Sequence, residues 1–297
     1  MLALRQAIRR VPAAAAALGM APILALTLAL ILAAAVSVSA SAQGKLEARY
    51  TVTLAGIPIG KGSWVIDIND TQYTAAASGV TVGLMRAFTG GQGSSGTRGT
   101  LQAGQPTSSI YAGTITSGKK TDEVRLTIAN GNVKDFTVDP PQDDMSERVP
   151  MTEAHRRGVE DPMTASLLRV PGSGEPLSAE ACKHTVSVFD GRLRYDLQLA
   201  FKRMETVKAD KGYAGPVVVC AVYFTPVAGY IPTRAAMKYL TKQRDIEVWM
   251  APIAGTRMLV PFRAQGPTPI GTAVLEATEF VSVASPTRAS ANGSKTQ

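Results

Sequence analysis

The sequence predicts a mainly β protein built on a single antiparallel sheet, with two or three short helices. Apolar and polar side chains alternate over 193–201, LRYDLQLAF, which gives a strand with one apolar face. Asp190-Gly191 and Asn130-Gly131 are typical of tight hairpin turns, because these residues tolerate positive φ. Gly, Pro and Asn divide the rest of the chain into about a dozen short strands.

Residues 1–42 are predicted to be a signal peptide. Arginines precede an apolar run over 11–36, and Ala-Ser-Ala at 40–42 supplies the small residues that a signal peptidase reads. The run is also long enough to span a bilayer, so an uncleaved anchor is the alternative. No cysteine follows the run, so a lipoprotein anchor is not expected. We therefore expect a soluble periplasmic protein that begins at Gln43.

The charge of the chain argues against nucleic acid as a partner. The formal charge is +8, and removing the three arginines of the leader leaves +5. The basic residues are scattered and do not interleave with aromatic ones, so nucleic-acid binding is not expected. A mildly basic surface suits an anionic membrane or an acidic ligand, although solvated surface charge is the simpler interpretation. We expect a monomer that contacts the membrane only transiently.

Short strands are predicted over most of the first half of the exported chain. Tyr50, Val52 and Leu54 alternate with polar residues, and the chain returns after the turn at Gly56. Asn130-Gly131 gives the strongest hairpin signal. The strands are expected over 50–54, 64–68, 73–78, 96–102, 107–117, 122–129 and 133–138.

Two segments interrupt this pattern. Apolar residues recur at helical spacing over 80–88, which predicts a short helix that covers one end of the sheet. Residues 90–99, GGQGSSGTRG, contain a literal G-x-G-x-x-G at Gly91, Gly93 and Gly96. A phosphate-binding loop needs a strand before this motif and a helix after it, whereas the order expected here is the reverse. We therefore expect a flexible loop.

Residues 139–181 are predicted to be an insertion of loop and helix. Pro140-Pro141 ends the preceding strand, and the acidic residues that follow lack calcium-loop spacing, so no metal site is expected. Asp161-Pro162 is typical of a helix start. The insertion belongs to one domain over 43–285, and residues 286–297 are predicted to be a disordered tail. The last strands of this domain are expected over 245–250, 257–264 and 272–283.

Cys182 and Cys220 are expected to form a disulfide. In an oxidising compartment, two cysteines 38 positions apart favour a structural bridge, with two buried free thiols as the alternative. There is no CxxC motif and no histidine cluster, so zinc is not expected.

The hairpins constrain how this bridge can form. Counting from the turns puts Cys182 level with Leu199 and Cys220 level with Phe201, so the cysteines would flank the middle strand at about 9.5 Å. A disulfide allows about 7 Å between Cα atoms. We therefore predict that Cys182 lies outside the ladder, with Lys183 or His184 as the first paired residue. The preceding segment should fold over the apolar face to meet Cys220.

Four stretches resemble a known family: YTVTLAGIPIG, VFDGRLRYDL, CAVYFTPVAGY and RDIEVWMAPIAGTRMLVPFRAQGPTPIGTAVLEATEF. They are similar to the bacterial domain-of-unknown-function family 3108 over nearly the whole exported chain. The resemblance implies an exported protein of Gram-negative bacteria without an established activity. It also implies a strongly curved sheet or half-open barrel, similar to that of the lipoprotein carriers. No catalytic residues carry over.

Enzyme signatures are missing from the sequence. There is no G-x-S-x-G and no HExxH. His155 lies in a charged stretch, His184 is interpreted as a sheet residue, and Asp190 is explained by its turn. A carboxylate pair for glycoside chemistry stays open, because such pairing is spatial. No catalytic residue, cofactor or metal is predicted.

Three functions remain. The first is a non-enzymatic periplasmic envelope protein that binds a lipid or another hydrophobic ligand on the curved sheet. The second is a structural or interaction module in envelope assembly, with an envelope protein as its partner. The third is a hydrolase of envelope polymers. For the first, the expected lining of the inner face is Leu193, Tyr195, Leu197, Leu199, Phe201, Val222 and Phe224.

Overall fold

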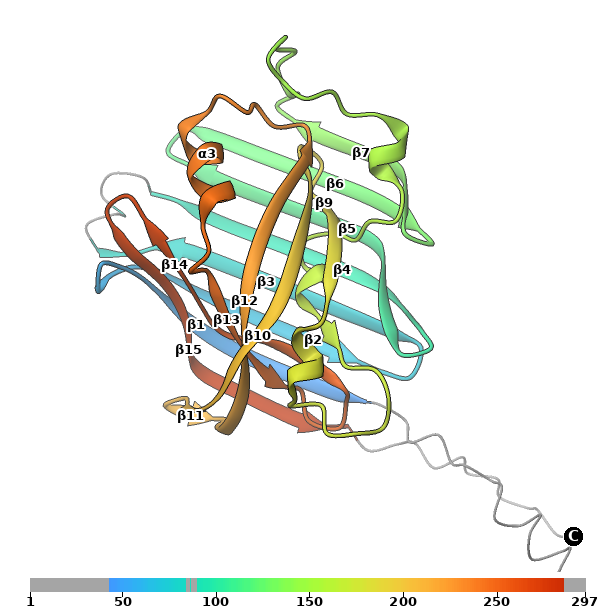
Figure 1. The fold of residues 1–297 in the computed structure, drawn as a ribbon, viewed down its shortest axis with the longest axis vertical. Helices are drawn as coiled ribbons and strands as arrows, with labels where there is room; N and C mark the ends of the chain where they lie inside the picture. The colour runs from blue at the N-terminus through green and yellow to red at the C-terminus, as the bar shows by residue number, and fades with distance from the viewer. Residues whose placement is uncertain (1–42, 84–85, 87–89, 286–297) are drawn as a thin grey trace, which may run out of the picture. The chain divides into compact units, whose positions relative to one another are not determined.

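The computed structural model describes residues 43–83, 86 and 90–285 (Figure 1). The predicted signal peptide and the predicted tail lie outside these residues, as does most of the helix expected over 80–88. Among the described residues, no helix is both long and apolar enough to cross a membrane.

Fifteen strands form one sheet. The strands are β1 (Gly44–Leu54), β2 (Ile57–Ile68), β3 (Gln72–Thr81), β4 (Gln92–Gln102), β5 (Gln105–Ser117), β6 (Lys120–Ala129), β7 (Asn132–Asp139), β8 (Leu168–Arg169), β9 (Thr185–Phe189), β10 (Arg194–Lys208), β11 (Lys211–Gly212), β12 (Ala214–Ala228), β13 (Glu247–Pro252), β14 (Met258–Thr268) and β15 (Gly271–Ala284). The main path runs β7-β6-β5-β4-β3-β2-β1-β15-β14-β13-β12-β10-β9, while β11 pairs with β15 and β8 with β14. The strands pair antiparallel, apart from the short β11 beside β15.

Helix makes up little of the described residues. One α-helix is described over its whole length, α3 (Ala235–Lys242), beside three 3-10 turns, η1 (Glu153–Arg156), η2 (Thr164–Ser166) and η3 (Ala179–Cys182). Gly83 and Arg86 are helical as well. The prediction of a mainly β chain with one antiparallel sheet is confirmed, but the sheet is larger than a half-barrel and is not closed. The expectation of two or three helices is wrong for this part of the chain. After Asp161-Pro162 a single turn forms, because Leu168 already pairs with Leu259 of β14.

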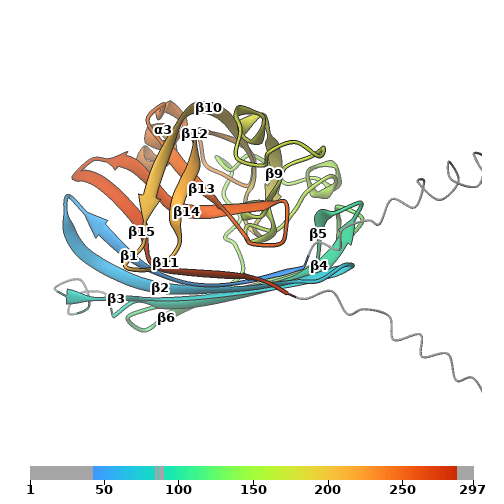
Figure 2. The same cartoon turned by 90° about the horizontal axis from the view of Figure 1, so that it is seen from below.

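The first strands form a broad curved layer, and the later strands rise over it (Figure 2). Between β1–β3 and β12–β15 lies the largest core cluster, which includes Leu46, Ile66, Trp249, Phe262 and Phe280. The period of two builds this core, since buried and exposed residues alternate along β1. We call this region the filled region.

A second cluster covers the opposite face of β12. Val217 and Val219 face the filled region, whereas Val218 and Cys220 belong to a separate cluster with residues of the segment 168–182. Cys182 is bonded to Cys220, with 5.5 Å between the Cα atoms. The predicted disulfide is therefore present, and the segment before Cys182 folds over this face of the sheet as expected.

The pairing around the bridge was predicted in part. Cys182 lies in η3, outside the ladder, and the Leu199 N–H donates to the His184 carbonyl oxygen at 2.8 Å. Phe201 pairs with Cys220 as expected. These observations confirm that Cys182 leaves the sheet before the strand begins.

The prediction of a two-residue turn at Asp190-Gly191 is wrong. The loop spans Asp190–Leu193, so Tyr195 pairs with Val188, two residues away from the predicted register. The physical reason is the Asp190 carboxylate, which accepts the N–H groups of Arg192 at 2.8 Å and Leu193 at 2.7 Å and closes a wider turn. A shift of two keeps every side chain on its predicted face.

A segment of the insertion joins the two edge strands β7 and β9. Arg157 forms a bridge to Asn132, and Glu160 forms one to Val188 of β9. A third core cluster lies beneath this segment and combines Leu126 and Ile128 of β6 with Val159 and Phe189. The segment 157–166 therefore lies between the sheet edges and forms part of the cover over the concave face of β3–β5.

Candidate functional site

The concave face of β3–β5 carries a cavity of about 740 Å³ whose floor consists of small residues. Ala77 pairs with Ser95, and Ser95 pairs with Gly113. One step further along the strands, Gly79 pairs with Gly93. Because cross-strand partners point to the same face, these residues form one continuous block without bulky side chains, which leaves a recess in the sheet.

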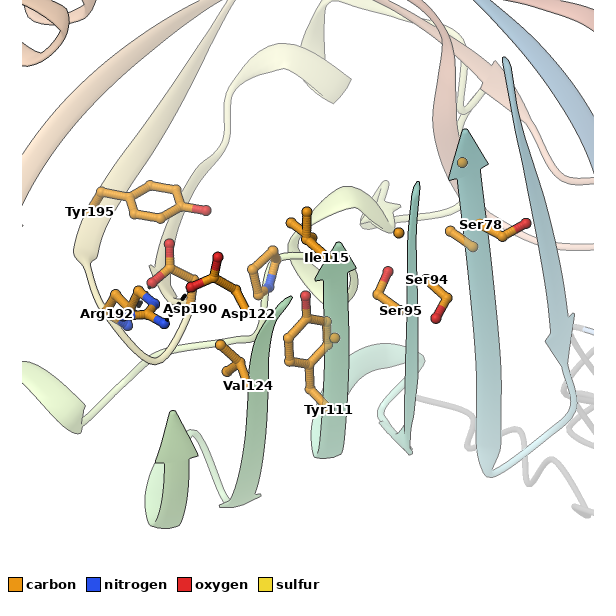
Figure 3. Close-up of a pocket in the computed structure, with 15 residues that line it drawn as sticks. Ser78, Ser94, Ser95, Tyr111, Ile115, Asp122, Val124, Asp190, Arg192 and Tyr195 are labelled. Atoms are coloured by element: carbon orange, nitrogen blue, oxygen red, sulfur yellow. Dashed lines mark hydrogen bonds and ion pairs between the residues drawn. The ribbon is translucent and has the colours of Figure 1, made fainter. Parts of the chain in front are cut away.

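Tyr111 lies along this floor. A Cβ atom on Gly113 would come within 2.9 Å of the Tyr111 hydroxyl oxygen, so glycine at this position leaves room for the ring. The hydroxyl faces the cavity among the lining residues (Figure 3). Burial raises the pKa of Tyr111 to about 12, and the nearby carboxylates of Asp161 and Asp190 add to this rise. The phenol is therefore neutral at physiological pH.

The cover segment 157–166 is held to the floor by a buried carboxylate. Asp161 accepts the N–H groups of Met163 at 2.8 Å and Thr164 at 3.0 Å. Its other oxygen accepts the hydroxyls of Thr97 on β4 and of Thr164. The Tyr73 hydroxyl of β3 lies 2.6 Å from the Thr164 hydroxyl. This network satisfies the buried charge and fixes Pro162, the next residue, at the cavity wall.

Glu160 fixes the same segment to β5. Its carboxylate accepts the Ser108 N–H at 2.7 Å. Burial raises the pKa of Glu160 to about 7, the Ser108 N–H opposes this rise, and the charge of Asp161 adds to it. The cover is therefore attached to β3, β4 and β5, and one attachment titrates near neutral pH.

Charged side chains gather at one end of the cavity (Figure 3). Arg192 donates to Asp122 of β6 at 2.9 Å, and the Asp190 carboxylate lies beside them. Burial raises the pKa of Asp190, and the N–H groups of Leu193 and Arg192 oppose that rise. A Cβ on Gly191, whose φ is +94°, would come within 2.6 Å of Val124, so glycine lets the loop sit close against β6.

A second cavity of about 330 Å³ adjoins the first. The two share Ala77, Ser78, Ser95, Tyr111 and Pro162 as lining residues. The walls of the smaller cavity are bulky and apolar, with Tyr50, Trp64, Met163, Pro261 and Leu275. The combined space therefore runs from a charged end, over a floor of small residues, to an apolar end.

The chemistry of this space suits binding. The ionisable groups at its wall are an Asp–Arg ion pair, a second aspartate and three tyrosines, Tyr50, Tyr111 and Tyr195, each with a pKa raised by burial. Within residues 43–83, 86 and 90–285, no three His, Cys, Asp or Glu side chains come together as a metal ion would require. Apolar walls with a few polar groups at one end are typical of sites for small amphiphilic ligands.

The seven residues expected to line the inner face are divided between several environments. Tyr195 lines the large cavity, and its ring lies 5.3 Å from that of Phe224. Leu199 and Val222 pack against the second cluster, under the segment 168–182. Leu193 lies in the β9–β10 loop, Leu197 pairs with Phe224, and Phe201 is exposed. That these residues hold a ligand stays a prediction.

The sequence did not lead us to predict the floor of the cavity, and the prediction of a flexible loop over 90–99 is wrong. Gln92–Gln102 is strand β4, paired with β3 on one side and β5 on the other. Backbone ladders do not need side chains, so glycine and serine form them when the neighbouring strands are in place. A signal was available, since Gly93 and Ser95 continue the alternation that places Thr97 inward.

Comparison with known proteins supports a family and little more. The family model described as "Protein of unknown function (DUF3108)" matches residues 49–278. No curated protein matches the chain.

Two solved structures are similar. One is a β-barrel-like DUF1849 protein from Brucella abortus, with 8% identity, a TM-score of 0.44, and coverage of 82% of this chain and 98% of that chain. The other is a DUF1329 family protein from Desulfovibrio piger, with 9% identity, a TM-score of 0.18, and coverage of 86% of this chain and 90% of that chain.

Proposed function

The chain belongs to the DUF3108 family of proteins of unknown function, and from this premise we propose that it is a non-enzymatic periplasmic protein that binds the hydrocarbon chain of an amphiphile. The observation that carries the proposal is the recess over Ala77, Gly93, Ser95 and Gly113. Bulky inward side chains fill the core elsewhere in this sheet, whereas the small side chains at these positions leave a cavity of about 740 Å³. That volume lies within the range of small-molecule sites.

The distribution of side chains suggests how the ligand lies. The hydrocarbon chain extends over the small residues towards Trp64, Met163 and Leu275 at the apolar end. The polar head lies at the other end, where Arg192 and Asp122 form an exposed ion pair. Arg192 can donate hydrogen bonds and Asp122 can accept them, which favours a head group that offers both an acceptor and a donor.

The disulfide supports the proposed compartment. Bridges such as Cys182–Cys220 persist in oxidising compartments, of which the periplasm is one. The bridge fastens the segment 168–182, which continues directly from the cover. A secreted carrier whose cover is fixed in this way keeps its cavity formed in the absence of ligand.

Neighbouring alanines of β3 provide a matched test. Ala77 lines both cavities, whereas Ala76 points to the other face and is exposed. Ala77→Phe places a ring in the recess, and Ala76→Phe adds the same ring to the surface. Uptake of a fluorescent fatty acid should be strong for the wild type and for Ala76→Phe, and reduced at least about tenfold for Ala77→Phe, because the ring occupies the ligand's volume.

Native mass spectrometry gives an independent readout. Protein purified from its own cell envelope should carry a co-purified lipid, and Ala77→Phe should carry less. If the wild type carries no lipid and takes up no fatty acid, or if both variants bind equally, ligand binding in this cavity is wrong. A stable crosslinked protein partner together with an empty cavity would instead favour an interaction module in envelope assembly.

A further inference from the structure

Two adjacent hairpin turns expose isoleucine side chains. Ile57 follows the β1–β2 turn and is 64% exposed, and Ile270 in the β14–β15 turn is 72% exposed. The Ala55 N–H donates to the Thr272 carbonyl oxygen at 2.9 Å, so the two turns lie side by side. Neither turn contains a charged residue. Single exposed aliphatic residues are common, but two at neighbouring uncharged tips form a protruding apolar edge.

Basic side chains lie at the same end of the sheet as this edge. The β1–β2 and β5–β6 turns lie at one end of the meander, on the left of Figure 1, because successive antiparallel strands reverse direction. Lys119 and Lys120 lie in and beside the β5–β6 turn. Lys242 ends α3 and Arg244 follows it. Two residues later, Ile246 lies within 3.2 Å of a Cβ placed on Gly266, close to the end of β14.

The acidic groups at this end are largely neutralised. Asp122 is paired with Arg192, and Glu123 lies 3.5 Å from Arg125. Asp245 leaves one further negative charge, against the positive charges of Lys119, Lys120, Lys242 and Arg244. The end of the sheet therefore combines apolar tips with a surplus of positive charge.

The cavity opens at the same end. Ile115 lines the large cavity and is 63% exposed, two residues before the end of β5. Gly79 and Gly93, also in the lining, lie close to the ends of β3 and β4 that meet the β3–β4 connection. A ligand that leaves or enters the cavity here passes beside the apolar edge.

We propose that this end of the sheet docks on an anionic lipid bilayer, with Ile57 and Ile270 inserted among the acyl chains and the lysines near the head groups. Charge complementarity selects this occupant, because a second copy would bring two positive ends together. Shallow insertion of a few apolar side chains with basic residues beside them is sufficient for reversible binding. The purpose of docking, ligand exchange with the bilayer, rests on the proposed function, but the docking surface itself does not.

Vesicle flotation tests the surface. The exported protein, which is predicted to begin at Gln43, is mixed with vesicles of phosphatidylcholine alone, or of equal parts phosphatidylcholine and phosphatidylglycerol. Wild type should float with the anionic vesicles and much less with the neutral ones, and added salt should weaken the binding. The double variant Ile57→Ser/Ile270→Ser should lose at least about tenfold in affinity, because two aliphatic side chains no longer insert.

The matched control removes two exposed valines elsewhere. Val65→Ser/Val283→Ser changes side chains that are 41% and 52% exposed and that lie away from the tips. This variant should bind like the wild type. Equal loss in both double variants, or no binding of the wild type to anionic vesicles, overturns the docking proposal. A dimer in solution that only the tip variant abolishes would overturn it in favour of a second copy.

Fatty-acid uptake in the absence of vesicles separates this proposal from the proposed function. The tip variant should retain the uptake of the wild type, because its changes lie outside the cavity lining. Retained vesicle binding by Ala77→Phe, with lost uptake, would complete the separation. Vesicle binding without any fatty-acid uptake would leave the docking surface standing and remove the proposed ligand.

Discussion

Strands β2 and β3 are filled at one end and hollow at the other. On β3 the inward residues run from Tyr73 and Ala75, which are buried in the largest core cluster, to Ala77 and Gly79, which line the cavity. On β2, Ile66 lies in the same core, and two pairs further along, Gly62 lines the smaller cavity. The same ladder and the same period of two run through both regions. Within this one pair of strands, the volume of the inward side chains distinguishes the end that encloses core from the end that encloses open space.

The largest expected effect lies in the filled region. Phe262 is buried, and its ring contacts those of Phe280 at 5.5 Å and Tyr213 at 6.4 Å. Phe262→Ala should lower the free energy of unfolding by about 4 kcal/mol, because it removes apolar burial and leaves a cavity. Urea unfolding with an unchanged slope would measure it. A cost below about 1 kcal/mol would mean that this region is as loosely packed as the hollow one.

The disulfide should contribute a comparable amount. Cys182→Ala with Cys220→Ala removes a crosslink across 38 residues, for which loop entropy gives about 4 kcal/mol. Thermal unfolding of the double variant, with reduced wild type as a comparison, tests this value. Equal stability of the variant and the oxidised wild type would contradict it.

Adding volume should distinguish the two regions directly. Ala251 is fully buried in the filled region, so Ala251→Phe should cost at least about 2 kcal/mol through overpacking. Ala77→Phe should cost less than about 1 kcal/mol, because the ring enters open space. Chemical unfolding of both variants under the same conditions measures the difference. Similar costs would show that the recess collapses in solution, and the comparison drawn above would fail.

Sequence reasoning predicted the filled region better than the hollow one, for a physical reason. Bulky side chains such as those of 193–201 produce a period-two pattern, so strands and faces could be read, and the reach of a disulfide was enough to place Cys182 outside the ladder. Glycine and serine at 93–96 differ too little in polarity to make the alternation visible, so the cavity floor was interpreted as a loop, although counting back from Thr97 places Gly93 and Ser95 inward. The helix α3 was missed as well, although Ala, Met, Lys and Leu in its sequence favour helix.

The assignment of lining residues shows a second limit. Alternation established that Leu197, Leu199 and Phe201 share a face, and β-pairing bears this out. Alternation does not say what covers that face. The segment 168–182 packs over Leu199, and this contact depends on a bridge between residues far apart in sequence. Which face is hollow is therefore a property of the whole fold.

The smallest expected effect concerns the cover over the hollow region. Burial raises the pKa of Glu160 to about 7 from its ordinary 4.5, so the folded state holds a proton that the unfolded state releases between these values. The stabilisation from this proton is complete below pH 4.5 and is lost as the pH rises through 7.

Glu160→Gln keeps an oxygen to accept the Ser108 N–H and carries no charge. Relative to the wild type, the variant should gain about 1 kcal/mol in the free energy of unfolding between pH 5 and pH 8, a value reduced for partial solvent screening. The measured quantity is the difference in the free energy of unfolding between variant and wild type. The titration of His184, which both proteins contain, therefore cancels. A constant gap between variant and wild type at the two pH values would mean that Glu160 is already charged in the folded protein. The cover would then be attached to β5 by an ionised carboxylate and would not respond to pH in this range.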